Sequence, residues 1–330
     1  MMVFDPALVT KDLSKEEWKY VLLDVLSGTS RLTARLVSME IAKAIASEDV
    51  FTKALSRIAG KIMEKAVTPY ISAAVLLILS TKEVTEDSVA ELLKIADIEP
   101  SKRYMNFVSR IKPIEDIGAY SPTLYYVMVT GNKLEASTLT KVLGAMGMKP
   151  QDKTSEYVIE TYNSMVNNKK IDKSSIEERL EDSIMEASGM ISKVMGLEVD
   201  RIFEMEGMDE RIRRGFIPYL SAAGVLAYLG FDIAIIGEEK FRAYEKNLID
   251  AVGINADNEM LDFVIKSLRM GLFPYVYISA IYFLKGIGIK ITVEKMMDIA
   301  KILGAPRDEA AAQYILSMYA QYTGSDAKTG

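Results

Sequence analysis

The sequence predicts an all-α protein, built as a duplicated helical repeat. Three observations indicate this. Apolar residues recur three and four positions apart in segments such as LSKEEWKYVLLDVL and TARLVSMEIAKAIA. Ser-x-x-Glu boxes, which cap helix N-termini, begin at Ser14 and Ser174. No segment keeps the two-residue alternation of a strand, so we expect no sheet.

One apolar helix opening is written twice in the chain. PYISAAVLLILS, residues 69–80, returns as PYLSAAGVLAYL, residues 218–229. Ser27-Gly28 and Ser188-Gly189 also match between the two regions. Such self-similarity is the sequence signature of repeated architecture. We therefore predict two pseudo-equivalent halves, residues 1–168 and 172–330.

Each half divides further into a helical leader and two modules of three helices. The predicted leaders are residues 1–66 and 172–215; the predicted modules, first to fourth, are residues 69–112, 121–165, 218–270 and 274–322. In each module an apolar first helix should begin at a proline, where the missing N–H costs nothing. These prolines are Pro69, Pro122, Pro218 and Pro274.

Turn residues support this plan for the modules. Thr85 and Thr292 stand where a side-chain oxygen can cap a second helix. Gly147, Gly253 and Gly304 stand where a helix should end in a left-handed residue. The sequence therefore predicts the same helix–turn–helix plan in each module.

The first and last modules also share a pattern with a known family. It is carried by Tyr70, Ala73, Ala74, Leu76, Leu77, the run Lys82 to Asp87, Leu93, Ala96 and Ile98, and by Tyr277, Ala280, Ile291, Thr292, Ile299, Gly304, Asp308 and Glu309. In these residues the modules resemble the helical N-terminal domain of archaeal and eukaryotic acidic ribosomal stalk proteins. The resemblance implies helical modules that pair through apolar faces. That family recruits translation factors through an acidic tail, whereas this sequence ends AQYTGSDAKTG, so we do not expect factor recruitment to carry over.

Composition narrows the possible functions. The 330 residues contain no Cys and no His, which excludes disulfides, thiolate nucleophiles, Cys-ligated metals and Ser–His–Asp triads. Carboxylates could still bind Mg²⁺ or Ca²⁺. Lys, Tyr, Glu or Asp side chains could still transfer protons. No dinucleotide or phosphate-binding glycine motif occurs, so no cofactor is expected. With a net charge of −6, a nucleic-acid partner is not expected either.

No membrane span and no secretory signal are expected. Residues 216–236 and 270–291 are apolar, but proline and glycine interrupt both, which is typical of buried helices. The N-terminal MMVFDPALVTKDLSKEEW lacks a basic stretch followed by an apolar core. We therefore predict a cytoplasmic protein.

A few residues are candidates for function. Arg211, Arg213 and Arg214 follow an acidic stretch and are the predicted partner-binding residues; alternatively, they complement the dipole at the end of a helix. Asp24 and Asp232 each stand alone in an apolar stretch, where a buried carboxyl could have a raised pKa and take part in catalysis, or could simply lie at the rim.

Together these features favour a non-enzymatic helical scaffold that binds a helical partner or itself. The alternative is a small-molecule binder or enzyme that uses a Tyr-lined apolar cavity and an isolated carboxylate.

Overall fold

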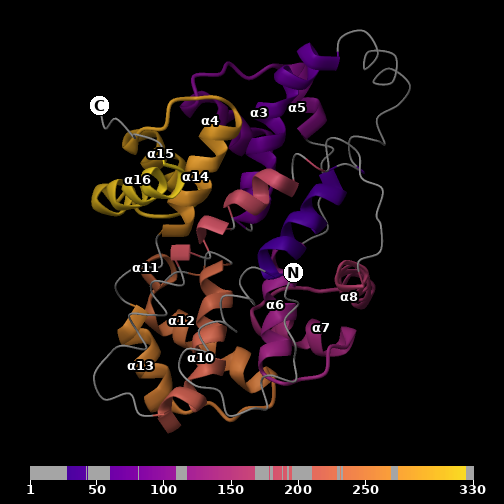
Figure 1. Cartoon of the computed structure of the whole chain (residues 1–330), viewed down its shortest axis with the longest axis vertical. Helices are drawn as coiled ribbons and strands as arrows, with labels where there is room; N and C mark the ends of the chain where they lie inside the picture. Colours follow the sequence, from indigo (N-terminus) through magenta and orange to yellow (C-terminus); the bar gives the residue numbers. More distant parts are fainter. Residues whose placement is uncertain are drawn as a thin grey trace. The chain divides into compact units, whose positions relative to one another are not determined.

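The computed structural model describes residues 28–41, 43, 60–80, 82–108, 117–167, 178, 181–187, 189–191, 193–194, 210–228, 231, 233–268 and 274–324. Within these residues the chain is all-α, with thirteen labelled helices and no strand (Figure 1). The prediction of the fold class is confirmed at this level.

The chain forms two compact units, and each combines segments that lie far apart in the sequence. Unit 1 contains residues 1–33, 116–172 and 188–275, and unit 2 contains residues 34–115, 173–187 and 276–330. Neither unit coincides with one of the two predicted halves. Unit 2 brings together the first and fourth predicted modules, and unit 1 the second and third.

In unit 2, the first module contributes α3 (Gly60–Leu79), α4 (Glu86–Ile95) and α5 (Lys102–Val108), which pack against one another. The fourth module contributes α14 (Pro274–Gly286, in this unit from Val276), α15 (Val293–Ile302) and α16 (Glu309–Thr323). The two modules meet where α4 lies against α15 (Figure 1). The buried face of α4 is apolar, formed by Val89, Leu92 and Leu93. The second helices of the two modules thus form one seam of unit 2.

In unit 1, the second module contributes α6 (Ile117–Val129), α7 (Ala136–Ala145) and α8 (Asp152–Val166). The third contributes α10 (Glu210–Tyr228), α11 (Ile233–Ile236), α12 (Glu238–Ala251) and α13 (Asn258–Leu268). Helix α7 packs against α12, and α6 packs against α10. All of α6 is buried, which agrees with its predominantly apolar sequence.

The predicted caps and turns are confirmed. The Thr85 hydroxyl accepts from the Ser88 amide at the start of α4, and the Thr292 hydroxyl accepts from the Lys295 amide at the start of α15. Gly147, Gly253 and Gly304 all have positive φ, between 80° and 85°. A residue without a Cβ reaches this conformation at no steric cost, so glycine fits there. Asp97 takes the same role after α4, with φ 57°.

A tyrosine of the first helix ties each module to its third helix. The hydroxyls of Tyr70, Tyr219 and Tyr277 accept hydrogen bonds of 2.7–2.8 Å from the backbone amides of Ser101, Asp257 and Asp308. In the second module the Gln151 amide lies 3.4 Å from the Tyr120 hydroxyl. Each acceptor tyrosine therefore satisfies an amide next to the start of the third helix, which has no partner inside that helix.

The predicted position of the prolines is wrong in three modules. Pro274 is the first residue of α14, but Pro69, Pro122 and Pro218 lie inside α3, α6 and α10. A proline removes only its own backbone donor and bends a helix without always ending it. The residues before each of these prolines continue the same helix, so the helices begin earlier than predicted.

No helix in the described part of the chain is long and apolar enough to cross a membrane. Of residues 216–236, those up to Tyr228 belong to α10 and residues 233–236 form α11. The described portion of residues 270–291 includes α14 and the turn after it.

Candidate functional site

The three predicted partner-binding arginines lie at the N-terminal end of α10, which begins at Glu210. Their side chains are outside the described part of the structure, so their role in binding a partner stays a prediction. The alternative interpretation, that they complement the dipole at a helix C-terminus, is wrong. The N-terminal end of a helix carries partial positive charge and does not stabilise basic residues.

Asp24 and Asp232, the two isolated carboxylates, lie outside the described residues. The described part of the chain contains no group of three acidic residues that could hold a metal ion.

A buried carboxyl does lie in unit 1, on α12. The Glu245 side chain is 0% exposed, and neither of its oxygens has a hydrogen-bond partner among the described residues. Burial disfavours the charged form and raises the pKa of Glu245 well above its usual value. Burial in the folded protein therefore favours the neutral form of this carboxyl.

A tyrosine hydroxyl belongs to the same buried cluster. Tyr126 on α6 is 1% exposed, and its hydroxyl also has no partner in the described structure. Burial raises the pKa of Tyr126, and the negative charge that Glu245 can carry raises it further. Burial and the charge that Glu245 can carry also raise the pKa of Tyr219 on α10, but the hydroxyl of Tyr219 accepts a hydrogen bond from the Asp257 amide. We call Glu245, Tyr126 and Tyr219 the buried acid cluster.

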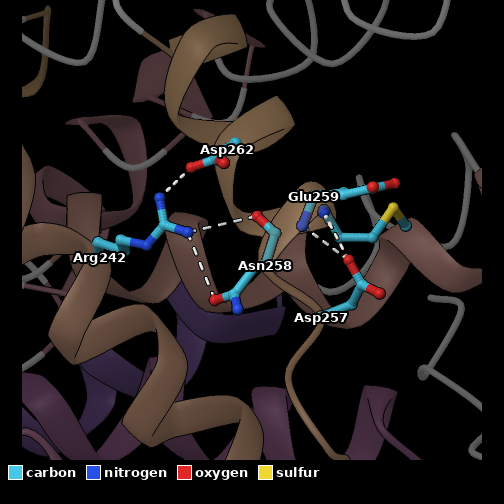
Figure 2. Close-up of polar contacts among 6 residues, drawn as sticks. Arg242, Asp257, Asn258, Glu259 and Asp262 are labelled. Atoms are coloured by element: carbon cyan, nitrogen blue, oxygen red, sulfur yellow. Dashed lines mark hydrogen bonds and ion pairs between the residues drawn. The ribbon is translucent and has the colours of Figure 1, made fainter.

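Arg242 is the cation that interacts electrostatically with Glu245, but its guanidinium is bound to Asp262. It lowers the pKa of Glu245, but less than burial raises it. Figure 2 shows its guanidinium bound to the carboxylate of Asp262 and directed at the main-chain and side-chain oxygens of Asn258, each 3.4 Å away. The adjacent Asp257 carboxylate caps α13 by accepting from the amides of Glu259 and Met260. Arg242 thus joins α12 to α13 and leaves Glu245 unpaired.

The positions of both polar groups are apolar in the other modules. Glu245 lies eight residues before Gly253, the left-handed turn residue of the third module. The residues eight positions before the left-handed turn residue in the other modules are Val89, Leu139 and Met296, and all four side chains are 0% exposed. Tyr126 lies six residues after Tyr120, the first-helix tyrosine of the second module. The residues six positions after the corresponding tyrosines of the other modules are the buried Leu76, Val225 and Phe283. Unit 1 therefore carries a carboxyl and a tyrosine hydroxyl at two positions that are apolar in the other modules.

Sequence reasoning missed Glu245 because it looked for carboxylates in apolar runs. Glu245 lies in the charged segment EEKFRAYEKNLID, where an acid looks solvated. The usable signal was its register. An alignment of the four modules on their turn residues sets Glu245 against valine, leucine and methionine.

A second feature lies on the surface of α16 in unit 2. Tyr314 and Tyr322 are 53% and 40% exposed, and they are the large hydrophobic side chains found exposed in the described part of the chain. Between Ala310 and Thr323 the sequence of α16 has no charged residue. The exposed positions of α16 that follow Glu309, which we call the α16 face, are Ala310, Gln313, Tyr314, Ser317, Gln321, Tyr322 and Thr323.

The third helix of the second module has a different surface. The exposed positions of α8 are Asp152, Lys153, Glu156, Glu160 and Asn163, which are mostly charged. Protein interfaces are depleted of charge and enriched in tyrosine at their centres. The α16 face therefore has the composition of an interface, and the face of α8 has that of a solvated surface.

The comparisons with known proteins give no further guidance. No family model matches the chain, and neither the curated proteins nor the solved structures yield a match.

Proposed function

We propose that this protein is a non-enzymatic scaffold of duplicated helical modules, which pair inside the chain and associate with a second copy of the chain through the α16 face. The observation that carries the proposal is the uncharged, tyrosine-bearing surface of α16.

The duplication is supported by features that recur at matching places. Four tyrosines approach or bond the amides at the start of the third helices, and four left-handed residues follow the second helices. The tyrosine–amide separation is 31 residues in three modules and 38 in the third. The longer separation agrees with an insertion in the third module, which contains the short α11.

Pairing of modules is supported by similar contacts across the two seams. In unit 2, the Lys295 ammonium of α15 donates to the Ile95 carbonyl at the end of α4, 2.7 Å away. In unit 1, the Asn247 amide of α12 approaches the Ala145 carbonyl at the end of α7, 3.4 Å away. Asn132 in turn donates to the Val252 carbonyl after α12, 3.0 Å away. Side chains of one module thus satisfy carbonyls at the helix ends of the other, where no intrahelical donor exists.

A second copy is the occupant that the charges favour for the α16 face. With a net charge of −6, two copies repel each other on average. A face without charges avoids this repulsion, and the exposed rings of Tyr314 and Tyr322 give it apolar surface that a second copy can bury.

Sedimentation equilibrium of the full chain over a micromolar range tests the proposal. We expect the wild type to be dimeric at the upper concentrations, and the double variant Tyr314→Lys/Tyr322→Lys to be monomeric. The matched control is Gln151→Lys/Asn163→Lys, which adds the same charge at exposed positions in and beside α8 and should remain dimeric. A wild type that stays monomeric, or a control that dissociates equally, would overturn self-association.

A further inference from the structure

The two modules of unit 1 are held together around an unpaired carboxyl. Glu245 lies on α12, which packs against α7 of the other module and against α10 of its own. Helix α10 packs in turn against α6, which supplies Tyr126. Glu245 therefore lies within the packing of one module on the other and not on a free surface.

Unit 2 has the same kind of seam without the carboxyl. There α4 and α15 meet, and the positions in register with Glu245 are the buried Val89 and Met296. The chain thus contains its own reference, a module pair with an apolar seam.

We infer that unit 1 is a proton-sensitive module pair: loss of the proton from Glu245 loosens the packing of α12 against α7 and α10, whereas unit 2 does not respond.

The groups around Glu245 stabilise its charge less than burial destabilises it. On its own helix, Arg242 is bound to Asp262 of α13. From α6 and α10 come the hydroxyls of Tyr126 and Tyr219, and the latter is already engaged. Helix α11 has no ionisable residue. The remaining ionisable side chains of α7 and α13, namely Lys141, Glu259 and Lys266, are exposed. A carboxylate at this position would be solvated only if the seam opened to water.

The direction of the effect follows from linkage. Burial raises the pKa of Glu245 in the folded unit above its value in the unfolded chain. Below the unfolded value both states hold the proton, and pH has no effect through this group. Above it the unfolded chain releases the proton while the folded unit keeps it, so the stability of unit 1 falls as pH rises, until the folded pKa is passed. A lower pH therefore stabilises the packing between the two modules of unit 1, and a higher pH destabilises it.

Hydrogen exchange of the full chain, read by mass spectrometry from about pH 5.5 to about pH 8.5 and corrected for intrinsic rates, tests this inference. Protection of amides in α6, α7, α10 and α12 should fall with rising pH, by up to about tenfold per pH unit, the limit for one proton. Protection in α4 and α15 should not fall in this way.

Two variants separate the carboxyl from other causes. Glu245→Gln keeps the size of the side chain without the titration, and Glu245→Met installs the residue found in register on α15. Both should abolish the pH dependence in unit 1, and Glu245→Met should also raise protection there. The reciprocal Met296→Glu should transfer the pH dependence to α4 and α15. A wild type without pH-dependent protection in unit 1, or a Glu245→Gln variant that retains it in full, would overturn the inference.

Discussion

The hydroxyl of Tyr277 holds both sides of the turn before α16. It accepts a hydrogen bond from the Asp308 amide at 2.8 Å and donates one to the Pro306 carbonyl at 3.1 Å. Because Asp308 is the N-cap residue of α16, and its own carboxylate accepts from the Ala311 amide, the tyrosine and the cap fix the start of one helix together.

Removing this hydroxyl should cost stability. Tyr277→Phe leaves the Asp308 amide and the Pro306 carbonyl without their partner, so we expect the free energy of unfolding to fall by about 1–2 kcal/mol. The matched variant is Tyr120→Phe: the Gln151 amide lies 3.4 Å from its hydroxyl, and we expect the loss of this longer contact to cost about 0.5 kcal/mol or less. Urea denaturation of both variants measures the difference. Equal losses would show that the two bonds do not differ in strength.

Removing or adding a capping side chain at the start of a second helix should change the stability of the protein. Thr85→Ala and Thr292→Ala each remove a side-chain acceptor for a first-turn amide, and we expect each to cost about 1 kcal/mol. Helix α7 has Glu135 at this position, without a side-chain cap bond. Glu135→Thr should therefore stabilise the protein, by up to about 1 kcal/mol. Thermal melts of the three variants provide the test, and a destabilised Glu135→Thr would contradict it.

Two exposed glycine positions should respond to alanine in opposite directions. Gly144 lies in helix α7 and Gly253 has φ 84°, and a Cβ at either would meet nothing within 4 Å. Gly144→Ala should stabilise by about 0.5–1 kcal/mol, because glycine loses more backbone entropy in a helix. Gly253→Ala should destabilise by about 1 kcal/mol, because alanine is strained in the left-handed region. Chemical denaturation measures both signs, and matching signs would refute the argument.

Lys295 in unit 2 contacts the end of α4, nearly 200 positions earlier in the chain. The ammonium donates to the Ile95 carbonyl and pairs with the Asp97 carboxylate. Lys295→Met should cost about 1 kcal/mol, mainly through the carbonyl, because the Asp97 side chain is 81% exposed and its ion pair is screened by water. In a double-mutant cycle with Asp97→Asn we expect a coupling below about 0.5 kcal/mol. A larger coupling would assign the stabilisation to the ion pair.

Local features of the fold were predictable from the sequence because their causes are local. Thr85 and Thr292 cap their helices because a hydroxyl next to the first turn has free backbone amides within reach. Gly304 adopts a positive φ because the steric cost of that conformation depends on the residue's own side chain, and glycine has no Cβ. The association of α4 with α15 was not predicted. Helical periodicity shows which face of α4 is apolar but does not name the face that covers it.

The candidate sites show the same limit. The surface tyrosines of α16 could not be identified by counting, because most of the described tyrosines are buried to some degree and exposure depends on tertiary packing. Glu245 was missed because charged neighbours hid an inward-facing position. Only the register relative to Gly253 reveals that it replaces a core residue.

The order of segments along the chain affects biosynthesis. Residues 34–115 of unit 2 leave the ribosome long before residues 276–330, and most of unit 1 is translated in the interval. A nascent α4 can pack against α3 and α5, but its contact with α15 must wait until α15 emerges, while α6 to α13 can already assemble. Because translation delays this contact, we expect the early segment of unit 2 to expose apolar surface for longer than the segments of unit 1.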